Sequence, residues 1–330
     1  MRQNMVLITG ATGFLGRHLV SAFQHHGYLV VANARNRVAE FEPHRWVLGD
    51  LRDEKVQEAA VRGCTFVVNA AGLVKKVAPD GGWEKDMFQL NCEMAESLAR
   101  VSERAGVARF LQVSSTGVYG PRAPQICHEG SECLPDDVYE KSKWAGERRL
   151  AALANGSMQI IIARPSNIFG EWHSWNKLLS WMQAVQSGKV VLAGDPERAS
   201  VNYVYVRDVV EVAIQLLESP AIKSGEVFNI NTPATMGRFY QATAKAIGCP
   251  DARARAVPKQ VLAAAAIFLD CLSRVTAKKF PLSMDKFWEL AGNRVFSSEH
   301  LASVCPDFPQ TGLEEGLSRL TAHYRARGLL

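Results

Sequence analysis

Near its N-terminus the chain has an apolar run followed at once by a glycine-rich turn, and this order constrains the fold more than any other feature. Met5–Thr9 reads as a buried strand, Gly10-Ala11-Thr12-Gly13-Phe14-Leu15-Gly16 as a turn, and residues 17–26 as a helix that stops at Gly27. Glycines permit a tight turn and close backbone approach, so a pyrophosphate can lie against the amides at the helix N-terminus. The order of strand, turn and helix therefore predicts a dinucleotide site.

Strands and helices alternate along the first two-thirds of the chain. The expected strands are residues 5–9, 28–34, 45–48, 66–69, 109–113 and 159–163, and the expected helices between them include 54–61, 87–105 and 138–150. Apolar strands separated by helices indicate a parallel sheet covered on both faces, a doubly wound α/β fold. With 330 residues, the chain is long enough for this sheet and a smaller lobe.

A phenol and an ammonium are four residues apart in Tyr139-Glu140-Lys141-Ser142-Lys143. In a helix these two side chains are neighbours on one face. A nearby positive charge favours the phenolate, so we expect the pKa of Tyr139 to lie below its ordinary value of ~10. Tyr139 would then exchange a proton with a substrate near neutral pH. The spacing alone is weak evidence, because it arises often by chance.

The G-x-x-G-x-x-G turn, together with Tyr139 and Lys143, resembles the short-chain dehydrogenase/reductase superfamily. Phe14 after the second glycine resembles its extended branch, which contains nucleotide-sugar epimerases, dehydratases and reductases. The resemblance continues, in the family's order, through Asp50-Leu51, Asn69-Ala70-Ala71-Gly72, Ser114-Ser115-Thr116-Gly117-Val118-Tyr119-Gly120 and Arg164-Pro165-Ser166-Asn167-Ile168-Phe169-Gly170. It is looser beyond Asp208.

The resemblance implies a Rossmann domain over residues 1–170, whose core also receives 201–230. Residues 171–200 and 231–330 would form a smaller, mostly α substrate lobe. It also implies catalysis by Ser115, Tyr139 and Lys143. The implied cofactor-binding residues are Gly10, Thr12, Gly13, Phe14, Leu15, Gly16, Arg35, Arg37, Asp50, Leu51, Ala70, Ala71, Gly72, Asn91, Tyr139, Lys143 and Pro165, and the implied substrate-binding residues are Ser115, Thr116, Asn167 and Arg198.

The end of the second strand bears on the choice of cofactor. Enzymes that prefer NAD usually place a carboxylate there to bind the ribose hydroxyls, but this chain reads Asn33-Ala34-Arg35-Asn36-Arg37. Two guanidinium groups suit a 2′-phosphate instead. We therefore expect NADP, with NAD as the alternative.

The substrate is indicated less clearly. By resemblance, Asn167 would contact the diphosphate of a nucleotide sugar. An arginine expected seven residues before Asp208 is replaced by Val201, and Arg198 is its nearest substitute. The Asp-Glu pair of sugar dehydratases is also missing at Thr116 and Gly117, so dehydration lacks its acid and base.

Four hypotheses follow. The first is a keto-sugar reductase, and the second is a nucleotide-sugar 4-epimerase that uses the same residues. The third is a dehydrogenase of a sterol-like or lipophilic alcohol, and the fourth is a non-catalytic NADP-binding regulator. The complete set of Ser115, Tyr139 and Lys143 argues against the fourth.

Composition excludes several other classes. The net charge of +5 is dispersed, which gives no stripe for nucleic acid, and eight histidines without H-x-x-x-H spacing give no metal site. Seven cysteines without a C-x-x-C pair suggest reduced thiols and thus a cytoplasmic protein. A homodimer is also expected. Tryptophans 172, 175 and 181 indicate helix core more than a pocket. The apolar stretch 261–272 is too short to span a bilayer, but it would suit a membrane surface, a packed lobe helix or a dimer surface.

Overall fold

The computed structural model describes residues 4–74, 82–173, 177–276, 287 and 292–330. A seven-stranded sheet with the order β11-β7-β5-β4-β1-β2-β3 forms its centre, and every neighbouring pair is parallel. The strands are β1 (Met5–Thr9), β2 (Leu29–Ala34), β3 (Arg45–Leu48), β4 (Phe66–Asn69), β5 (Arg109–Val113), β7 (Gln159–Pro165) and β11 (Val227–Ile230). This confirms the expected doubly wound Rossmann fold.

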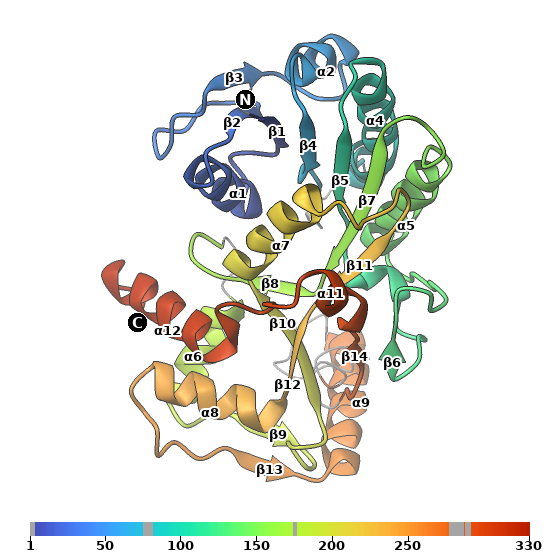
Figure 1. Ribbon diagram of the computed structural model, residues 1–330. Helices are drawn as coiled ribbons and strands as arrows, with labels where there is room; N and C mark the ends of the chain where they lie inside the picture. Colours follow the sequence, from blue (N-terminus) through green and yellow to red (C-terminus); the bar gives the residue numbers. More distant parts are fainter. Residues whose placement is uncertain (1–3, 75–81, 174–176, 277–286, 288–291) are drawn as a thin grey trace.

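Helices cover both faces of this sheet (Figure 1). One face packs on α1 (Phe14–His25) and α7 (Val206–Glu218), and the other on α2 (Glu54–Val61), α4 (Met94–Arg104) and α5 (Val138–Ala151). Within β1, Val6 and Ile8 join the first core and Leu7 joins the second. Successive side chains of a strand point to opposite faces, so a strand covered on both sides must be apolar throughout.

The helix expected at residues 87–105 is interrupted. The structure has α3 (Trp83–Phe88), a π-helical turn (Gln89–Glu93) and then α4. The turn carries Asn91, and its backbone lies so close to α5 that a Cβ added to Gly146 would be 2.4 Å from the Asn91 carbonyl oxygen. Such turns are inserted frequently where a helix serves a functional site.

Below the large sheet lies a second part with its own core. It contains the sheet β12-β10-β8 (Thr232–Thr235, Ser200–Tyr205, Asn167–Phe169) and the pair β9 (Val191–Ala193) and β13 (Arg255–Val257). Its helices are α6 (Lys177–Gln186), α8 (Met236–Ala246), α9 (Lys259–Thr276) and α12 (Gly312–Ala326). Three short elements remain: β6 (Ile126–Cys127) pairs with β14 (Val295–Phe296), and α11 (Glu299–Val304) packs on the core of the large sheet through Leu301. The C-terminal part is mostly helical, as expected.

Segment 201–230 is divided between the two parts. Its α7 and β11 belong to the large sheet's layers, whereas β10 pairs with β8 and β12 in the small sheet. In α6, Leu178, Leu179, Met182 and Val185 are buried, and Trp181 packs against the same core. Trp172 is 48% exposed, and Trp175 lies outside the described residues.

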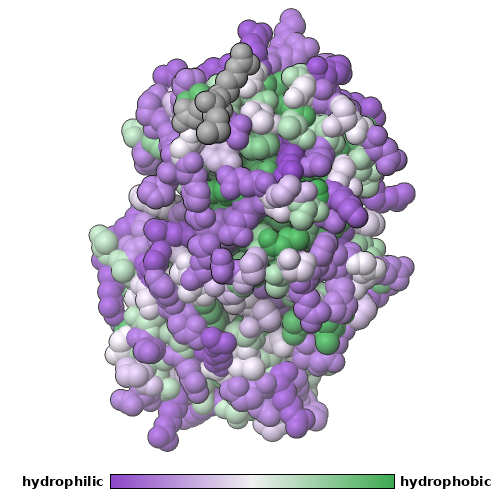
Figure 2. All heavy atoms as spheres, in the orientation of Figure 1, coloured by the Kyte–Doolittle hydropathy of each residue, from purple (hydrophilic) through white to green (hydrophobic). Residues whose placement is uncertain are grey.

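The face of the molecule seen in Figure 2 is mainly hydrophilic, with hydrophobic side chains visible between the upper and lower parts. Within the described residues, α9 carries much of the exposed apolar surface, at Val261, Ile267 and Phe268. Among those residues no helix is long and apolar enough to cross a bilayer.

Candidate active site

The glycine-rich turn after β1 brings the start of α1 against the end of β4. Gly10 has φ +62°, which favours glycine, and a Cβ there would be 3.0 Å from the Ala71 Cα. At Gly16 a Cβ would lie 2.1 Å from the Gly10 carbonyl oxygen, so no larger residue fits. Ala70, Ala71 and Gly72 follow β4 directly and therefore lie beside this turn.

The first turn of α1 is open to an anion. The cap residue of α1 is Gly13, which is exposed and has no side chain to occupy the amides of the first turn. Uncapped amides and the positive end of the helix dipole suit a phosphate. The turn Gly10–Gly16, with Thr12, Phe14 and Leu15, thus fits the pyrophosphate of a dinucleotide. Arg17, which sequence reasoning missed, donates to the Thr12 carbonyl at 3.0 Å.

Two arginines follow β2, as the sequence predicts. Both Arg35 and Arg37 are exposed. Asp50 is ion-paired with Arg52 at 2.6 Å, and this pair, with a smaller contribution from Arg35, lowers the pKa of the Asp50 carboxyl. Leu51 is buried. The guanidinium groups of Arg35 and Arg37 are thus accessible to solvent at the end of β2.

Ser115, Tyr139 and Lys143 come together where β5 ends and α5 begins. The Ser115 side chain is hydrogen-bonded to the Tyr139 phenol and accepts from the Gly117 amide at 3.0 Å. The Lys143 Nζ lies 6.0 Å from the centre of the Tyr139 ring and donates to the Val113 carbonyl at 3.0 Å. Asp137 and Glu140 form a capping box that fixes the start of α5.

The expected lowering of the Tyr139 pKa is wrong. Burial raises the pKa of Tyr139 to about 12, and a hydrogen bond from Ser115 opposes that effect only in part. Burial also lowers the pKa of Lys143 to about 8, although Glu147 acts in the opposite direction. Desolvation disfavours both charged forms, and it outweighs the attraction between them.

Asn91 holds three segments of the site together. Its side chain accepts from the Leu73 amide at 2.8 Å and donates to the Leu73 carbonyl at 3.0 Å. It also donates to Ser142 at 2.9 Å, and Ser142 donates to the Tyr139 carbonyl at 2.7 Å. The segment after β4 is thereby tied to the helix that carries Tyr139 and Lys143.

Behind Ser115 lies a buried ion pair that sequence reasoning missed. Arg164 binds Glu147 through two nitrogens, the shortest contact being 2.6 Å, and their side chains are 3% and 2% exposed. Ser114 donates to the same carboxylate, and Arg164 also donates to the Tyr119 hydroxyl at 2.9 Å. The sequence indicates Arg164 only as part of a family motif. Its partner Glu147 could not be predicted, because the pairing depends on how α5 packs against β7.

The predicted substrate residues are scattered. Thr116 is buried, and Asn167 is exposed and donates to the Asn202 carbonyl at 3.1 Å. The Arg198 side chain is 85% exposed and paired with Asp195 at 3.5 Å, so the structure does not bring it to the other site residues. Pro165 ends β7, and the buried Ser166 hydroxyl that follows it has no hydrogen-bond partner among the described residues.

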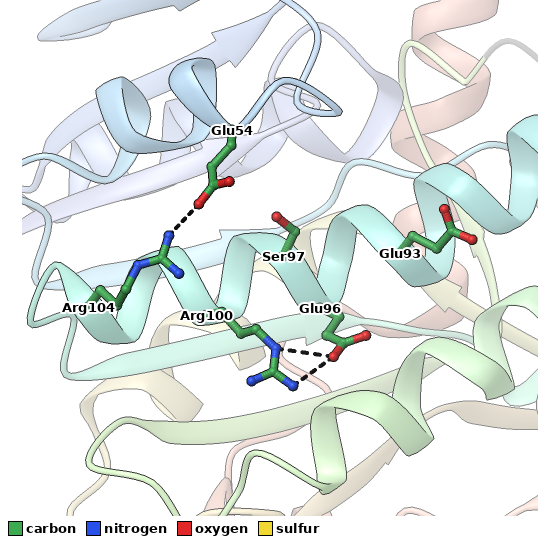
Figure 3. A pocket seen from close by; sticks show the side chains of 6 residues that line it. All are labelled: Glu54, Glu93, Glu96, Ser97, Arg100 and Arg104. Carbon is green, nitrogen blue, oxygen red and sulfur yellow. Dashed lines mark hydrogen bonds and ion pairs between the residues drawn. The ribbon is translucent and has the colours of Figure 1, made fainter.

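A separate pocket of about 310 Å³ lies on the outer surface of α2 and α4 (Figure 3). It is lined by Glu54, Glu93, Glu96, Ser97, Arg100 and Arg104. Several of these charges neutralise one another in ion pairs, and the lining includes none of the predicted site residues. We therefore assign no catalytic role to it.

Comparison with known proteins identifies the family. Residues 6–231 match the model of the NAD dependent epimerase/dehydratase family. The chain belongs to this family. It is 27% identical over 336 residues to N-acetyl-alpha-D-glucosaminyl-diphospho-ditrans,octacis-undecaprenol 4-epimerase of Escherichia coli O157:H7, covering 97% of this chain and 94% of the relative. It is 26% identical over 220 residues to UDP-glucose 4-epimerase of Vibrio cholerae, covering 65% and 67%.

Solved structures share the fold. MoeE5 in complex with UDP-glucuronic acid and NAD superposes with a TM-score of 0.73 at 22% identity, covering 98% of this chain and 99% of that one. The chain is thus an extended short-chain dehydrogenase/reductase, an enzyme of a family that depends on a nicotinamide dinucleotide.

Proposed function

We propose that this protein is an NADP-dependent oxidoreductase that reduces a keto group on the sugar of a nucleotide-linked substrate. The observation that carries this proposal is the convergence of Ser115, Tyr139 and Lys143 next to the segment that packs on the glycine-rich turn: a Cβ on Gly72 would lie 3.0 Å from the Lys143 Nζ. A group that binds a dinucleotide and a group that exchanges a proton are then adjacent. In this proposal residues 1–170 hold the cofactor, and 171–200 with 231–330 hold the substrate in a homodimer.

The residues divide the chemistry among them. The cofactor, when bound, supplies the hydride. Ser115 would donate a hydrogen bond to the substrate oxygen, and Tyr139 would give that oxygen its proton as the carbon is reduced. Lys143 would bind the ribose hydroxyls, and its charge beside Tyr139 would stabilise the phenolate that remains.

NADP is proposed because Arg35 and Arg37 are exposed at the end of β2, where a 2′-phosphate would lie. The uncapped amides of α1 suit the pyrophosphate of NADP and of NAD equally well. A family described as NAD dependent leaves NAD as the alternative.

A 4-epimerase is the nearest alternative, and it needs the same three catalytic residues. It returns the hydride to the opposite face of the sugar and keeps its cofactor, whereas a reductase releases it. Both named relatives are 4-epimerases of a sugar attached to a diphosphate. Asn167, at the start of β8, is the residue that we propose for that diphosphate.

A second candidate is a substrate whose diphosphate carries a lipid. One relative, which matches 97% of the chain, is named for an undecaprenol-linked sugar. In addition, Val261, Ala264, Ile267, Phe268 and Cys271 form an exposed, mostly apolar stripe along α9, at helical spacing. A stripe of this kind suits the surface of a bilayer, where a lipid-linked sugar resides.

Tyr139→Phe tests the catalytic assignment. Removing the phenolic oxygen should lower turnover by about 10²- to 10⁴-fold and leave the Kd of NADPH within about twofold. Retained turnover would exclude Tyr139 from proton transfer. Because the substrate is not identified, mass spectrometry of ligands retained through gentle purification comes first. A retained NAD would favour the epimerase, and a uridine or lipid diphosphate would identify the substrate class.

A further inference from the structure

A row of buried polar side chains runs across the sheet beneath the catalytic residues. Thr9 is the register partner of Asn69, and Asn69 is the register partner of Gln112, so the three residues lie side by side on β1, β4 and β5. Their exposed fractions are 0%, 0% and 2%. Polar groups buried this deeply are costly unless each one is hydrogen-bonded.

The hydrogen bonds of this row have a fixed direction. The Ala71 amide donates to the Thr9 hydroxyl at 2.9 Å, and Thr9 donates to Oδ1 of Asn69 at 2.6 Å. The nitrogen of Asn69 therefore faces Gln112 and donates to its Oε1 at 2.8 Å. Since the oxygen of Gln112 is used as an acceptor, its Nε2 donates to the Val113 carbonyl at 3.0 Å.

The row ends on the carbonyl that also holds the catalytic lysine. Lys143, only 7% exposed, donates from Nζ to the same Val113 oxygen at 3.0 Å. The titratable groups that face Lys143 are Tyr139 and Glu147 of its own helix, and Arg164 on β7 is bound to Glu147. One carbonyl thus accepts from two donors, a neutral amide and an ammonium.

Building on the proposed role of Lys143 in cofactor binding, we propose that Gln112 is a positioning residue that keeps the Val113 carbonyl paired when Lys143 turns to the cofactor ribose. A carbonyl with two lone pairs accepts two donors, so losing one of them leaves it satisfied. Without Gln112, release of Lys143 would leave the buried Val113 carbonyl unpaired. The free energy lost in this way would weaken cofactor binding. Thr9 and Asn69 serve the same purpose, because they orient the Gln112 amide.

Gln112→Met tests this role, because it keeps the length of the side chain and removes its polar atoms. The Kd of NADPH should rise about tenfold, the cost of one unpaired buried acceptor. The pKa of Lys143 in the cofactor-free protein should rise as well, since the ammonium then has the carbonyl to itself. Fluorescence titration measures the Kd, and the ¹³C shift of the Lys143 Cε against pH measures the pKa.

Thr243→Val is the matched control. Thr243 is fully buried in the lower part, donates to the Phe239 carbonyl at 2.8 Å and accepts from Trp181 at 3.0 Å. This variant also loses buried hydrogen bonds, so it controls for a loss of stability that is unrelated to Lys143. It should leave both the Kd of NADPH and the Lys143 pKa unchanged.

Gln112→Glu keeps the proposal testable if the methionine variant does not fold. A protonated carboxyl group still donates to Val113 and accepts from Asn69, whereas the ionised form cannot donate and would hold Lys143 in place. This variant should bind NADPH like the wild type at low pH and progressively more weakly as the pH rises. Binding that follows the wild-type pH dependence would overturn the proposal.

The outcomes separate this inference from the proposed function. If the wild type binds neither NADPH nor NADH, the proposed function fails. If the wild type binds and Gln112→Met binds within twofold of it, with an unchanged Lys143 pKa, only the role of Gln112 fails.

Discussion

Two buried cations, Arg164 and Lys143, lie on or beside α5, and they differ in the number of partners that bind them. Arg164 is held by both oxygens of Glu147, by Tyr119 and by the Glu129 carbonyl at 3.3 Å. Lys143, one helical turn before Glu147, donates to a single backbone carbonyl in the described part of the chain. Both side chains are almost inaccessible to solvent.

The difference shows how a buried charge can be structural in one case and available for chemistry in the other. A guanidinium with bidentate and further partners is fixed in place, because moving it would leave several groups unpaired. A lysine on one carbonyl is poorly stabilised as an ion, so a new partner such as a ribose hydroxyl can attract it. We therefore expect the lysine, with its single partner, to be the cation that contacts a ligand.

Arg164→Met should give the largest effect on stability. It leaves the Glu147 carboxylate buried without its cation, and breaking such a pair costs about 3–5 kcal/mol in the free energy of unfolding. Urea denaturation at pH 7 measures this loss. The double variant Glu147→Leu with Arg164→Met should recover much of it, because no uncompensated charge remains. A loss below about 1 kcal/mol in the single variant would place Arg164 in the same class as Lys143.

Lys143→Met should instead raise the free energy of unfolding. Burial lowers the pKa of Lys143 to about 8, against ~10.4 in an unfolded chain. The native state therefore binds the proton less tightly than the unfolded state does, and the ionised lysine destabilises the fold at pH 7. The difference between the two pKa values corresponds to about 3 kcal/mol. After about 1 kcal/mol for the lost hydrogen bond to Val113, the variant should be more stable by about 2 kcal/mol.

The same linkage predicts a pH dependence. Between pH about 8 and ~10.4 the unfolded wild type binds more protons than the native protein, so its stability should rise with pH. In Lys143→Met this rise should be absent, and cofactor binding should be weakened at every pH. Urea denaturation at a series of pH values tests this. If the stability of both proteins changed with pH in parallel, the fold would not lower the pKa of Lys143.

The sequence could predict the large sheet because its strands and the glycine turn are local patterns. The sequence also predicts the grouping of Ser115, Tyr139 and Lys143 at the carboxyl end of the sheet, where the structure shows them together. The pairing of Asn69 with Gln112 could not be read from the sequence, because it depends on the register between β4 and β5. The raised pKa of Tyr139 could not be predicted for a related reason, because the burial that causes it depends on how the whole molecule packs.

The substrate residues were the least predictable part of the site. The spacing from Asp208 points to Arg198, but this side chain lies exposed beside Asp195. Asp208 itself is buried and accepts from the amides of Thr311 and Gly312, at 2.7 and 3.1 Å, at the start of α12. Loops that are positioned by distant segments leave no periodic pattern in the sequence, so spacing alone could not locate their side chains.

Arg35→Ser extends the comparison to an exposed cation and should have the smallest effect on stability. Because Arg35 is solvated, its loss should change the free energy of unfolding by less than about 0.5 kcal/mol. The Kd of NADPH should rise about tenfold and that of NADH much less, because only NADPH has a 2′-phosphate for the guanidinium. The control is Arg62→Ser, which removes an exposed arginine that follows α2. Equal weakening of both cofactors would overturn the assignment of NADP and return the choice to NAD, with the epimerase as the favoured function.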